Sequence, residues 1–323
     1  MKEIGFGRKR TDFKSAIQKY GFYIFFVILV AVFGILSPKF LTFNNIIGVL
    51  LQSASVGIAA AGMCFVLITG GIDLSAGSII FFSATVCGAL IGKEVSFVWV
   101  LLISVLCGAL VGAINGLLIA RFKMVPFIST LATMTACRGL TLCISEAKAQ
   151  YLSGSLQNMI MNAKVLGIPA VVLAMLAVML LGHIVLRYTP YGRQLYALGH
   201  NDSAASMIGI NVVRNKFFAY LLAGVTAGIA GLISAIRVGA VMPSLGQGQE
   251  FVIISSVVLG GVSLFGGKGN IFPGVFIGVL IISCIENGLV LINADPYLYT
   301  IVRGAVIFLS VLIDSIQNKG EAR

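Results

Sequence analysis

The chain has 323 residues, of which 59% are hydrophobic and only 10% are charged, and its mean hydropathy is +1.04. Water-soluble globular proteins do not reach such values, so a soluble enzyme and a soluble binding module are excluded. The formal net charge of +11 comes from basic residues that gather near the ends of apolar runs, as in membrane proteins, so no nucleic-acid partner is expected.

Apolar runs recur along the whole chain, and most approach the roughly 20 helical residues that cross about 30 Å of hydrocarbon. The runs are continuous and lack the alternation of a barrel strand, so we predict an all-α, polytopic membrane protein. About ten spans are expected, at 20–37, 46–69, 74–92, 97–120, 125–145, 165–187, 215–237, 250–265, 271–292 and 298–316. They form one transmembrane domain, 20–316, between an N-terminal tail, 1–19, and a C-terminal tail, 317–323.

Lys and Arg residues predict the orientation, because cytoplasmic loops and tails hold an excess of them. With ten spans and both termini in the cytoplasm, fifteen of the 22 Lys and Arg residues lie on the cytoplasmic side. The outer loops and outer span ends then hold only Lys39, Lys93, Lys148, Lys164 and Arg237. We therefore predict that the N- and C-termini are both cytoplasmic.

The first glycine-rich break, GGIDLSAGS at 70–78, places the carboxylate of Asp73 between two apolar runs. A charge at the bilayer centre costs roughly 2.5 to 3.5 kcal/mol on insertion scales, so such a residue is expected to be paired, solvated or functional. Asp73 can cap the following helix by accepting from the backbone N–H groups of Ser75 and Ala76. It can also line a solute path, and the sequence leaves both interpretations open.

Three further charged residues fall inside predicted spans. Glu286 and Arg303 lie near the outer ends of the last two spans, where they can form an ion pair or a polar patch along a solute path. Arg138 has no evident partner and is expected to face a water-filled cavity or a subunit interface. The candidates for the solute path are Asp73, Asn115, Thr130, Arg138, Glu286, Asn287 and Arg303.

Glycine spacing points to closely packed helices. Gly108, Gly112 and Gly116 form two overlapping GxxxG motifs, and the pairs Gly224/Gly228 and Gly274/Gly278 repeat the pattern. Small residues four apart let helix backbones approach closely in lipid, although such faces can also serve transport.

A second glycine-rich break, GGVSLFGGKGN at 260–270, matches the first at an offset of 190 residues. Internal symmetry is common in transporters, but chance similarity between glycine-rich segments is equally compatible with the match. Glu250 opens the span before this break, where an acidic residue favours a helix N-terminus.

The segment 188–214 is a long predicted cytoplasmic loop. Pro190 and Gly192 are expected to break the preceding span, Asn201 or Asp202 can cap a new helix, and Gly209 can end it. A helix of about two turns results, too short to cross a membrane. We interpret it as an element that docks onto a cytoplasmic partner.

Motifs of catalysis and cofactor binding are missing from the sequence. The nearest match to a P-loop has Val262 in place of the first glycine and Gly269 in place of the hydroxyl residue, so no ATP binding is expected. There is no GxSxG or HExxH motif, and the six cysteines lie in apolar runs without metal-ligand spacing. We expect no enzyme activity, no cofactor and no metal.

Four stretches resemble the ribose-type permease subunits of bacterial ABC sugar importers: GGIDLSAGSI (70–79), NGLLIARFKMVPFISTLATMTACRGL (115–140), GHNDSAASMIGI (199–210) and GGVSLFGGKGNIFPG (260–274). The resemblance extends essentially from end to end. It implies a permease of the bacterial cytoplasmic membrane that imports a monosaccharide by alternating access. It also implies three protein partners: a cytoplasmic ATP-binding subunit, an extracytoplasmic sugar-binding protein and a second permease subunit in a homo- or heterodimer.

In that family the loop after the sixth span fits a cleft of the ATPase. The residues of this chain that match the loop pattern are Gly199, Asn201, Ala204, Ala205, Gly209 and Ile210. The neighbouring Asn211, Val212 and Val213 depart from the pattern, while Gln247 and Gln249 are candidates for influencing the choice of solute or partner. A secondary transporter that uses Asp73 or Glu286 as an ion site is the alternative, and the identity of the solute stays open.

Overall fold

A computed structural model describes residues 6–152 and 155–319. Helices occupy the positions of all the predicted spans: α1 (Phe6–Leu36), α2 (Phe43–Ile68), α3 (Ala76–Ile91), α4 (Phe97–Gly116), α5 (Pro126–Ile144), α7 (Ala170–Tyr188), α10 (Val212–Val238), α11 (Gln249–Leu259), α12 (Phe276–Leu291) and α13 (Pro296–Lys319). Residues 1–5 and 320–323 of the two predicted tails lie outside the described part of the chain.

Several shorter elements complete the fold. π-helical turns extend α4 and precede α12, and short helices and strands lie in the connections: η1 (Leu117–Arg121), η2 (Ile271–Val275), α6 (Ser155–Asn162), α8 (Pro190–His200), α9 (Asp202–Met207), β1 (Gln150–Tyr151), β2 (Lys164–Val165), β3 (Ile168–Pro169) and β4 (Ala240–Val241). Strands β1 and β4 pair antiparallel, with Gln150 opposite Val241, and β2 pairs with β3. The sequence analysis did not predict these strands.

Six helical segments in the described residues are long and apolar enough to cross a membrane, namely α2, α4 with η1, α5, α7, α10, and η2 with α12. Four shorter apolar helical segments lie at Gly21–Leu36, Ala76–Ile91, Gln249–Leu259 and Tyr297–Leu309. The predicted helical membrane bundle is therefore confirmed. The count of ten spans and the orientation of the termini stay predictions.

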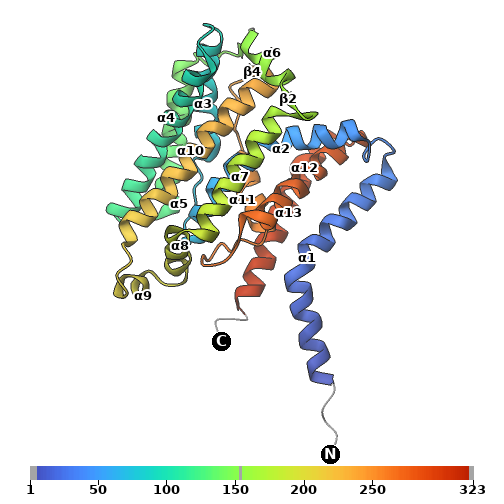
Figure 1. Ribbon diagram of the computed structural model, residues 1–323, viewed down its shortest axis with the longest axis vertical. Coiled ribbons are helices and arrows are strands. Elements are labelled where there is room, and N and C mark those ends of the chain that lie inside the picture. The colour runs from blue at the N-terminus through green and yellow to red at the C-terminus, as the bar shows by residue number, and fades with distance from the viewer. Residues whose placement is uncertain (1–5, 153–154, 320–323) are drawn as a thin grey trace, which may run out of the picture.

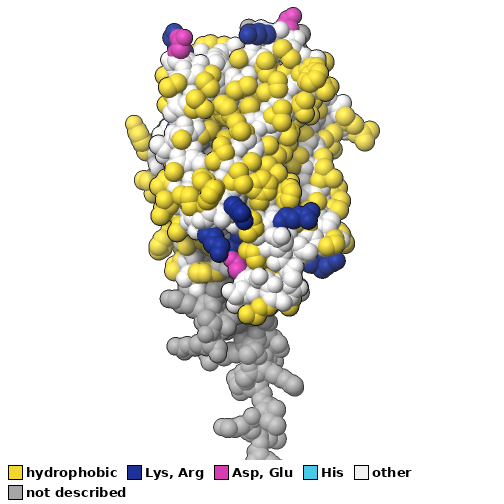
Figure 2. All heavy atoms as spheres, turned by 90° about the vertical axis from the view of Figure 1, so that its left-hand side faces the viewer, with side chains coloured by type: hydrophobic (Ala, Val, Ile, Leu, Met, Phe, Trp, Pro, Cys, Tyr) yellow, Lys and Arg dark blue, Asp and Glu magenta, His cyan; other side chains and the backbone are white. Residues whose placement is uncertain are grey.

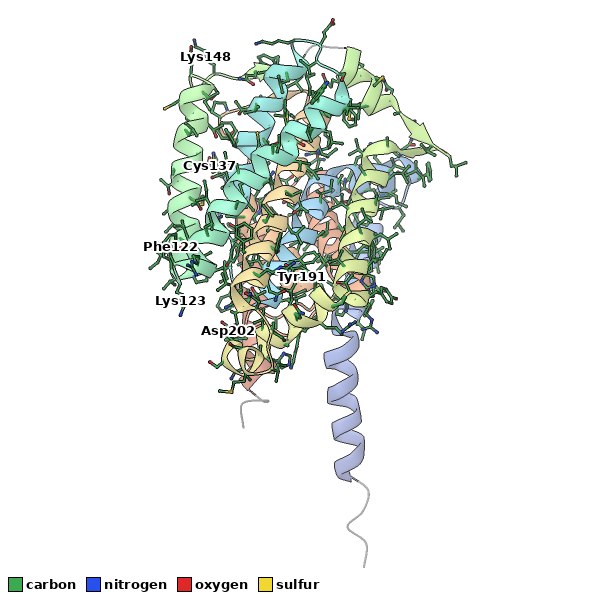
Figure 3. The ribbon with its side chains drawn as sticks, turned by 60° about the vertical axis from the view of Figure 1, so that its left-hand side comes forward. Phe122, Lys123, Cys137, Lys148, Tyr191 and Asp202 are labelled. Carbon is green, nitrogen blue, oxygen red and sulfur yellow. The ribbon has the colours of Figure 1, made fainter. Side chains whose placement is uncertain are left out.

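The elements divide between the two ends of the bundle. The start of α1 and the end of α13 lie at the same end as α8 and α9, whereas α6, β2 and β4 lie at the opposite end (Figure 1). Hydrophobic side chains cover the middle of the face formed around α4 and α5, and charged side chains gather above and below them (Figure 2). Lys123 and Lys148 mark the two ends of α5, with Cys137 between them (Figure 3).

Helices α2 and α10 form the centre of the bundle. The most apolar windows of these two helices are 83% and 72% buried, against 22% for α5 and 28% for α7. Helix α10 packs on α2, α3 and α4. Because lipid is as apolar as the side chains of the outer helices, these helices need little burial within the protein.

The glycine motifs serve close helix packing, as one of the two interpretations predicts. A side chain on Gly108 would overlap the carbonyl of Gly224, and a side chain on Gly224 would overlap the carbonyl of Gly108, so α4 and α10 touch through their backbones. Gly278 meets the carbonyl of Ser256 in the same way, which holds α12 against α11. Two backbones can approach this closely only where the side chain is a hydrogen atom.

Helices α2 and α11 end in the same way at the two glycine-rich breaks. Gly70 (φ 72°) and Gly261 (φ 85°) adopt the left-handed conformation that terminates a helix. The next N–H group donates back across the last turn in both cases, Gly71 to Val66 and Val262 to Val257, each at 3.2 Å. The eighth predicted span therefore stops at Leu259 rather than at 265.

The predicted cytoplasmic loop is mostly helical. As predicted, the preceding span ends at this point: α7 stops at Tyr188, and Pro190 occupies the first turn of the next helix, α8. Proline suits that position because its fixed φ is helical and its missing N–H group would have no partner there. The Thr189 hydroxyl caps α8 by accepting from the N–H group of Gly192 at 3.3 Å. The loop thus holds two helices, α8 and α9, where one was predicted.

Candidate solute path and coupling loop

Asp73 lies fully buried in the turn between α2 and α3. Its Oδ1 atom accepts from the Ser75 N–H group at 2.8 Å and from the Ser75 hydroxyl at 2.6 Å. The predicted bond from Ser75 is confirmed, but the second donor is the Ser75 hydroxyl rather than the N–H group of Ala76. The Oδ2 atom has no hydrogen-bond partner among the described residues. Asp73 therefore shapes the turn before α3 while one carboxylate oxygen stays available.

A chain of hydrogen bonds leads from Asp73 to α4 and α5. Asn115 donates from Nδ2 to the Ser75 hydroxyl at 2.8 Å, and its Oδ1 atom accepts from the Thr133 hydroxyl at 2.7 Å. Thr130 donates to the carbonyl of Pro126 at 2.9 Å in its own helix and lies 3.5 Å from the carbonyl of Ile72. Three predicted path residues, Asp73, Asn115 and Thr130, thus surround the first break.

Arg138 has partners that the sequence did not reveal. Its Nη1 atom donates to the carbonyl of Pro243 at 3.3 Å, and its Nη2 atom donates to the carbonyl of Leu245 at 3.1 Å. The guanidinium group also lies over the ring of Phe81, 5.3 Å from the ring centre, in a cation–π contact. These bonds tie α5 to the segment between β4 and α11.

The other three path candidates lie together around the ends of α12 and α13. Glu286 accepts from Arg303 at 2.8 Å, so the predicted ion pair is confirmed, and Gln52 donates to the second carboxylate oxygen at 3.2 Å. Asn287 exchanges two side-chain hydrogen bonds with Asn45, at 2.9 and 3.0 Å. The candidates therefore form separate groups rather than one site.

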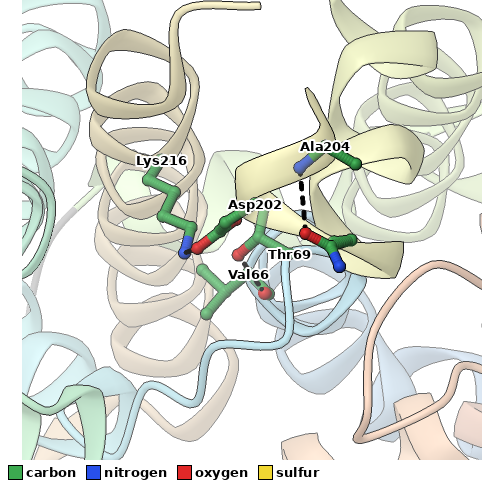
Figure 4. A network of polar contacts seen from close by, with 6 residues as sticks. Val66, Thr69, Asp202, Ala204 and Lys216 are labelled. Atoms are coloured by element: carbon green, nitrogen blue, oxygen red, sulfur yellow. Dashed lines mark hydrogen bonds and ion pairs between the residues drawn. The ribbon is translucent and has the colours of Figure 1, made fainter. Parts of the chain in front are cut away.

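Helix α9 has the predicted caps. The Asn201 side chain accepts from the N–H group of Ala204 at 2.9 Å (Figure 4). Gly209 (φ 85°) follows the helix in the left-handed conformation. The N–H group of Ile210 donates to the carbonyl of Ala205 at 3.1 Å, which closes the turn. Ala205 is buried and Ala204 is exposed. The matched loop residues thus form one compact, capped unit.

Helix α9 is tied to α10 and presents an apolar tip. An ion pair joins Asp202 to Lys216 of α10 (Figure 4). Met207 and Ile208, at the end of α9, are 87% and 75% exposed, although both are large apolar residues. Exposed apolar side chains on a short, rigid element are typical of a surface that another protein covers. The sequence analysis missed these two residues.

Helix α8 connects this loop to both glycine-rich breaks. Gly199 lies so close to the carbonyl of Ile68 and to the backbone of Gly267 that no side chain would fit. The Gly267 N–H group donates to the Ile68 carbonyl at 2.9 Å, which joins the two breaks directly. Tyr196 donates to the carbonyl of Gly269 at 2.7 Å. Burial raises the pKa of Tyr196 to about 12, so its hydroxyl keeps this proton at neutral pH.

Comparison with known proteins identifies the family of the chain. A family model described as the branched-chain amino acid transport system / permease component matches residues 45–311. The chain belongs to this permease family. As a family member with several apolar helices, it is a multi-pass protein of the bacterial inner membrane. No solved structure matches the chain.

Several curated permeases of this kind are similar to the chain over nearly its whole length. The ribose import permease protein RbsC of Bacillus subtilis (strain 168) is 41% identical over 309 residues, which cover 95% of this chain and 96% of that protein. The D-allose transport system permease protein AlsC of Escherichia coli (strain K12) is 39% identical, covering 97% of this chain and 96% of that protein. The L-arabinose ABC transporter permease protein AraH of Azospirillum brasilense is 36% identical, covering 96% and 91%.

The permease has polar residues at these sites that sequence reasoning missed. Thr133 lies in the stretch 115–140 but is uncharged, so nothing in the sequence indicated that it is a partner of Asn115. Glu250 was interpreted only as a helix N-terminal residue, yet it is buried to 7% exposure beside the first turn of α3. An acidic residue within an apolar run was the available signal for Glu250.

Proposed function

We propose that this chain is the permease subunit of an ABC importer that moves a monosaccharide across the inner membrane by alternating access. The observation that carries the proposal is the continuous backbone contact from the capped helix α9 through α8 to both glycine-rich breaks. Relatives that cover nearly the whole chain are named as ribose, allose and arabinose permeases, which supports a sugar as the solute.

In the proposed assembly, the permease has three surfaces that contact partner subunits. A cytoplasmic ATP-binding subunit holds α9, an extracytoplasmic sugar-binding protein delivers the solute at the opposite end, and a second permease subunit completes the path within the lipid. This assembly assumes ten spans with both termini in the cytoplasm. The position of α8 and α9 at the end where α1 starts and α13 ends supports that orientation (Figure 1).

The energy would enter through the coupling loop. When the ATPase subunits close, they move α9, and the ion pair of Asp202 with Lys216 transmits that motion to α10. The contacts of Gly199 with Ile68 and Gly267 transmit it to the turns that precede α3 and η2. The bundle then rocks between inward- and outward-open states. The permease itself performs no covalent chemistry in this scheme.

The path residues would act at two levels. The first level lies where α3 begins and comprises Asp73, Asn115 and Thr130, which the hydrogen bonds around the first break hold in place. Arg138 links α5 to the segment before α11. Glu286, Asn287 and Arg303 form a polar patch towards the other end of the bundle. A sugar needs hydrogen-bonding groups along its route because its hydroxyls lose water there.

Replacement of Ala204 by Trp tests the docking role of α9. Ala204 is exposed, so the bulky ring changes the surface of α9 without filling the bundle. We expect uptake of labelled sugar into cells to fall by about tenfold or more, the loss of about 1.4 kcal/mol of coupling, with unchanged amounts of permease in the membrane.

The matched control is Val213→Trp, at an exposed residue just past the loop pattern. It should transport like the wild type. Full uptake in the Ala204 variant, with ATP hydrolysis still tied to the sugar, would contradict the docking role.

A further inference from the structure

Helices α3 and α11 begin against each other inside the bundle. Gly77, in the first turn of α3, touches the carbonyl of Gly246 and the carboxylate of Glu250 so closely that a side chain there would overlap both. The helices have only 16 and 11 residues. Each is short because its first turn starts at this junction rather than at an end of the bundle.

The segment 242–248, which connects β4 to α11, reaches this junction from the end of the bundle where β4 lies. It is not helical, and Arg138, which lies six residues before the end of the apolar helix α5, holds the carbonyls of Pro243 and Leu245. The segment therefore enters the apolar depth of the bundle with irregular backbone.

This irregular segment is partly open to the outside of the chain. Met242 is 46% exposed, Phe251 in the first turn of α11 is 49% exposed, and Gln247 is exposed. Irregular backbone at membrane depth does not face lipid, because hydrocarbon cannot satisfy its N–H and C=O groups. The face between α5 and the start of α11 must therefore border partner protein, water or a solute path, and its polar side chains favour a solute path.

The side chains at this face suit a neutral solute with several hydroxyl groups. Arg138 uses two of its five N–H donors on carbonyls and so keeps donors for a ligand. Glu250 is 7% exposed, its carboxylate lies against Gly77, and Arg138 is near enough to attract it electrostatically. The buried Oε1 atom of Gln249 has no hydrogen-bond partner within the described part of the chain.

These groups offer both hydrogen-bonding roles with no net charge. A sugar hydroxyl can donate to the Glu250 carboxylate or to the Gln249 amide oxygen and at the same time accept from Arg138. The exposed ring of Phe251 adds an apolar surface for the C–H groups of a sugar ring. A solute with a single charge would lie beside a group of the same charge, either Arg138 or Glu250, and that group would repel it.

We propose that Glu250 and Arg138 form a solute-binding, specificity-determining site for a neutral polyhydroxylated solute at the junction of α3 and α11. This inference rests on the proposed function, because it places the site on the path of the imported solute. It adds Glu250 to the candidates for the solute path, and it places Gln249, already a candidate for influencing the choice of solute or partner, at the same site.

The test compares Glu250→Gln with the wild type in vesicles that also contain the ATP-binding subunit and the sugar-binding protein. The probe is whichever of D-ribose, D-allose and L-arabinose the wild type takes up, supplied at saturating concentration together with its deoxy analogue. We expect the variant to lose about tenfold or more of its maximal uptake rate, since a neutral amide accepts more weakly than a carboxylate. The preference for the full sugar over the analogue should fall with it.

The control is Glu146→Gln, which removes a carboxylate that is 71% exposed near the outer end of α5. It should leave rate and preference unchanged. Two further measurements separate a solute-binding role from a structural one: the ATP hydrolysis that the binding protein stimulates, and the melting temperature of the complex. Loss of a solute-binding residue should leave both values near those of the wild type. If Glu250→Gln does not assemble, Arg138→Lys, which keeps the charge but loses the planar fork, replaces it.

An unchanged rate and preference in the assembled variant would overturn the site. Parallel losses of uptake, stimulated hydrolysis and melting temperature would also overturn it, because they indicate a structural pair. If the wild type takes up no sugar at all under these conditions, the proposed function fails, which is distinct from failure of the site alone.

Discussion

Asp73 uses its two carboxylate oxygens differently. One carboxylate oxygen holds the turn before α3 through Ser75, and the other has no partner among the described residues. A capping role requires only the first oxygen. A fully buried carboxylate with a free oxygen is costly in an apolar bundle, so the second oxygen favours a role in the path over a cap alone.

Replacing Asp73 by Asn separates these two roles. The amide oxygen can still accept from Ser75, so the turn and the amount of permease in the membrane should change little. The charge is lost, and we expect sugar uptake to fall by about tenfold, as for loss of one charged hydrogen bond. Uptake per permease molecule, measured with labelled sugar and quantitative blotting, checks this. Equal losses of protein and uptake would indicate that Asp73 only caps α3.

Single residues also show the limit of sequence reasoning. The pairing of Glu286 with Arg303 was predictable because both charges lie close to one hairpin. The partners of Arg138 were not, because they are backbone carbonyls more than a hundred residues away, and a carbonyl leaves no mark in a sequence. The importance of Glu250 likewise depends on the neighbouring turn of α3, which only the fold brings there.

At the scale of helices, continuous apolar runs predicted the positions of the long elements well. Hydropathy does not report where the backbone turns, so 260–265 was included in a span although α11 ends at Leu259 and Gly261 turns the chain. The offset of 190 residues is also instructive. The helix caps Gly70 and Gly261 differ by 191, whereas the turns after them, in which Asp73 accepts from Ser75 and Ser263 accepts from Phe265, differ by 190. The two breaks thus have the same kind of helix cap and the same kind of side-chain turn, but the first break has one more residue between cap and turn.

The contact between α4 and α10 gives a direct test of the glycine motifs. Gly224→Ala places a methyl group against the backbone of Gly108 and Gly112, which cannot move aside as a side chain can. We expect the purified permease to lose about 1 to 3 kcal/mol of stability and to melt several degrees lower.

Gly48→Ala, in α2, is the matched control, because nothing lies within 4 Å of the added methyl group. Its melting temperature should stay the same or rise slightly, since Ala favours a helix over Gly. A Gly224 variant as stable as the wild type would show that the two helices do not pack through their backbones in the membrane.

At the scale of the whole molecule, the two ends of the bundle are linked by rigid contacts. At one end, α8 of the coupling loop meets the second glycine-rich break and the end of α2, where the first break begins. The two breaks lead into α3 and towards α12. Motion of a small capped helix can therefore shift long elements that reach the opposite end. In the proposed function, the ATP-binding subunit that holds α9 supplies the energy for this motion.

In the proposed function, the permease conducts sugar only when an ATP-binding subunit drives it. The most direct measurement is uptake of labelled D-ribose, D-allose and L-arabinose into sealed vesicles that contain the purified permease, alone or with the ATP-binding subunit and the sugar-binding protein. We predict accumulation against a gradient only with all components and ATP inside the vesicles. Accumulation by the permease alone, driven by an ion gradient, would contradict the claim.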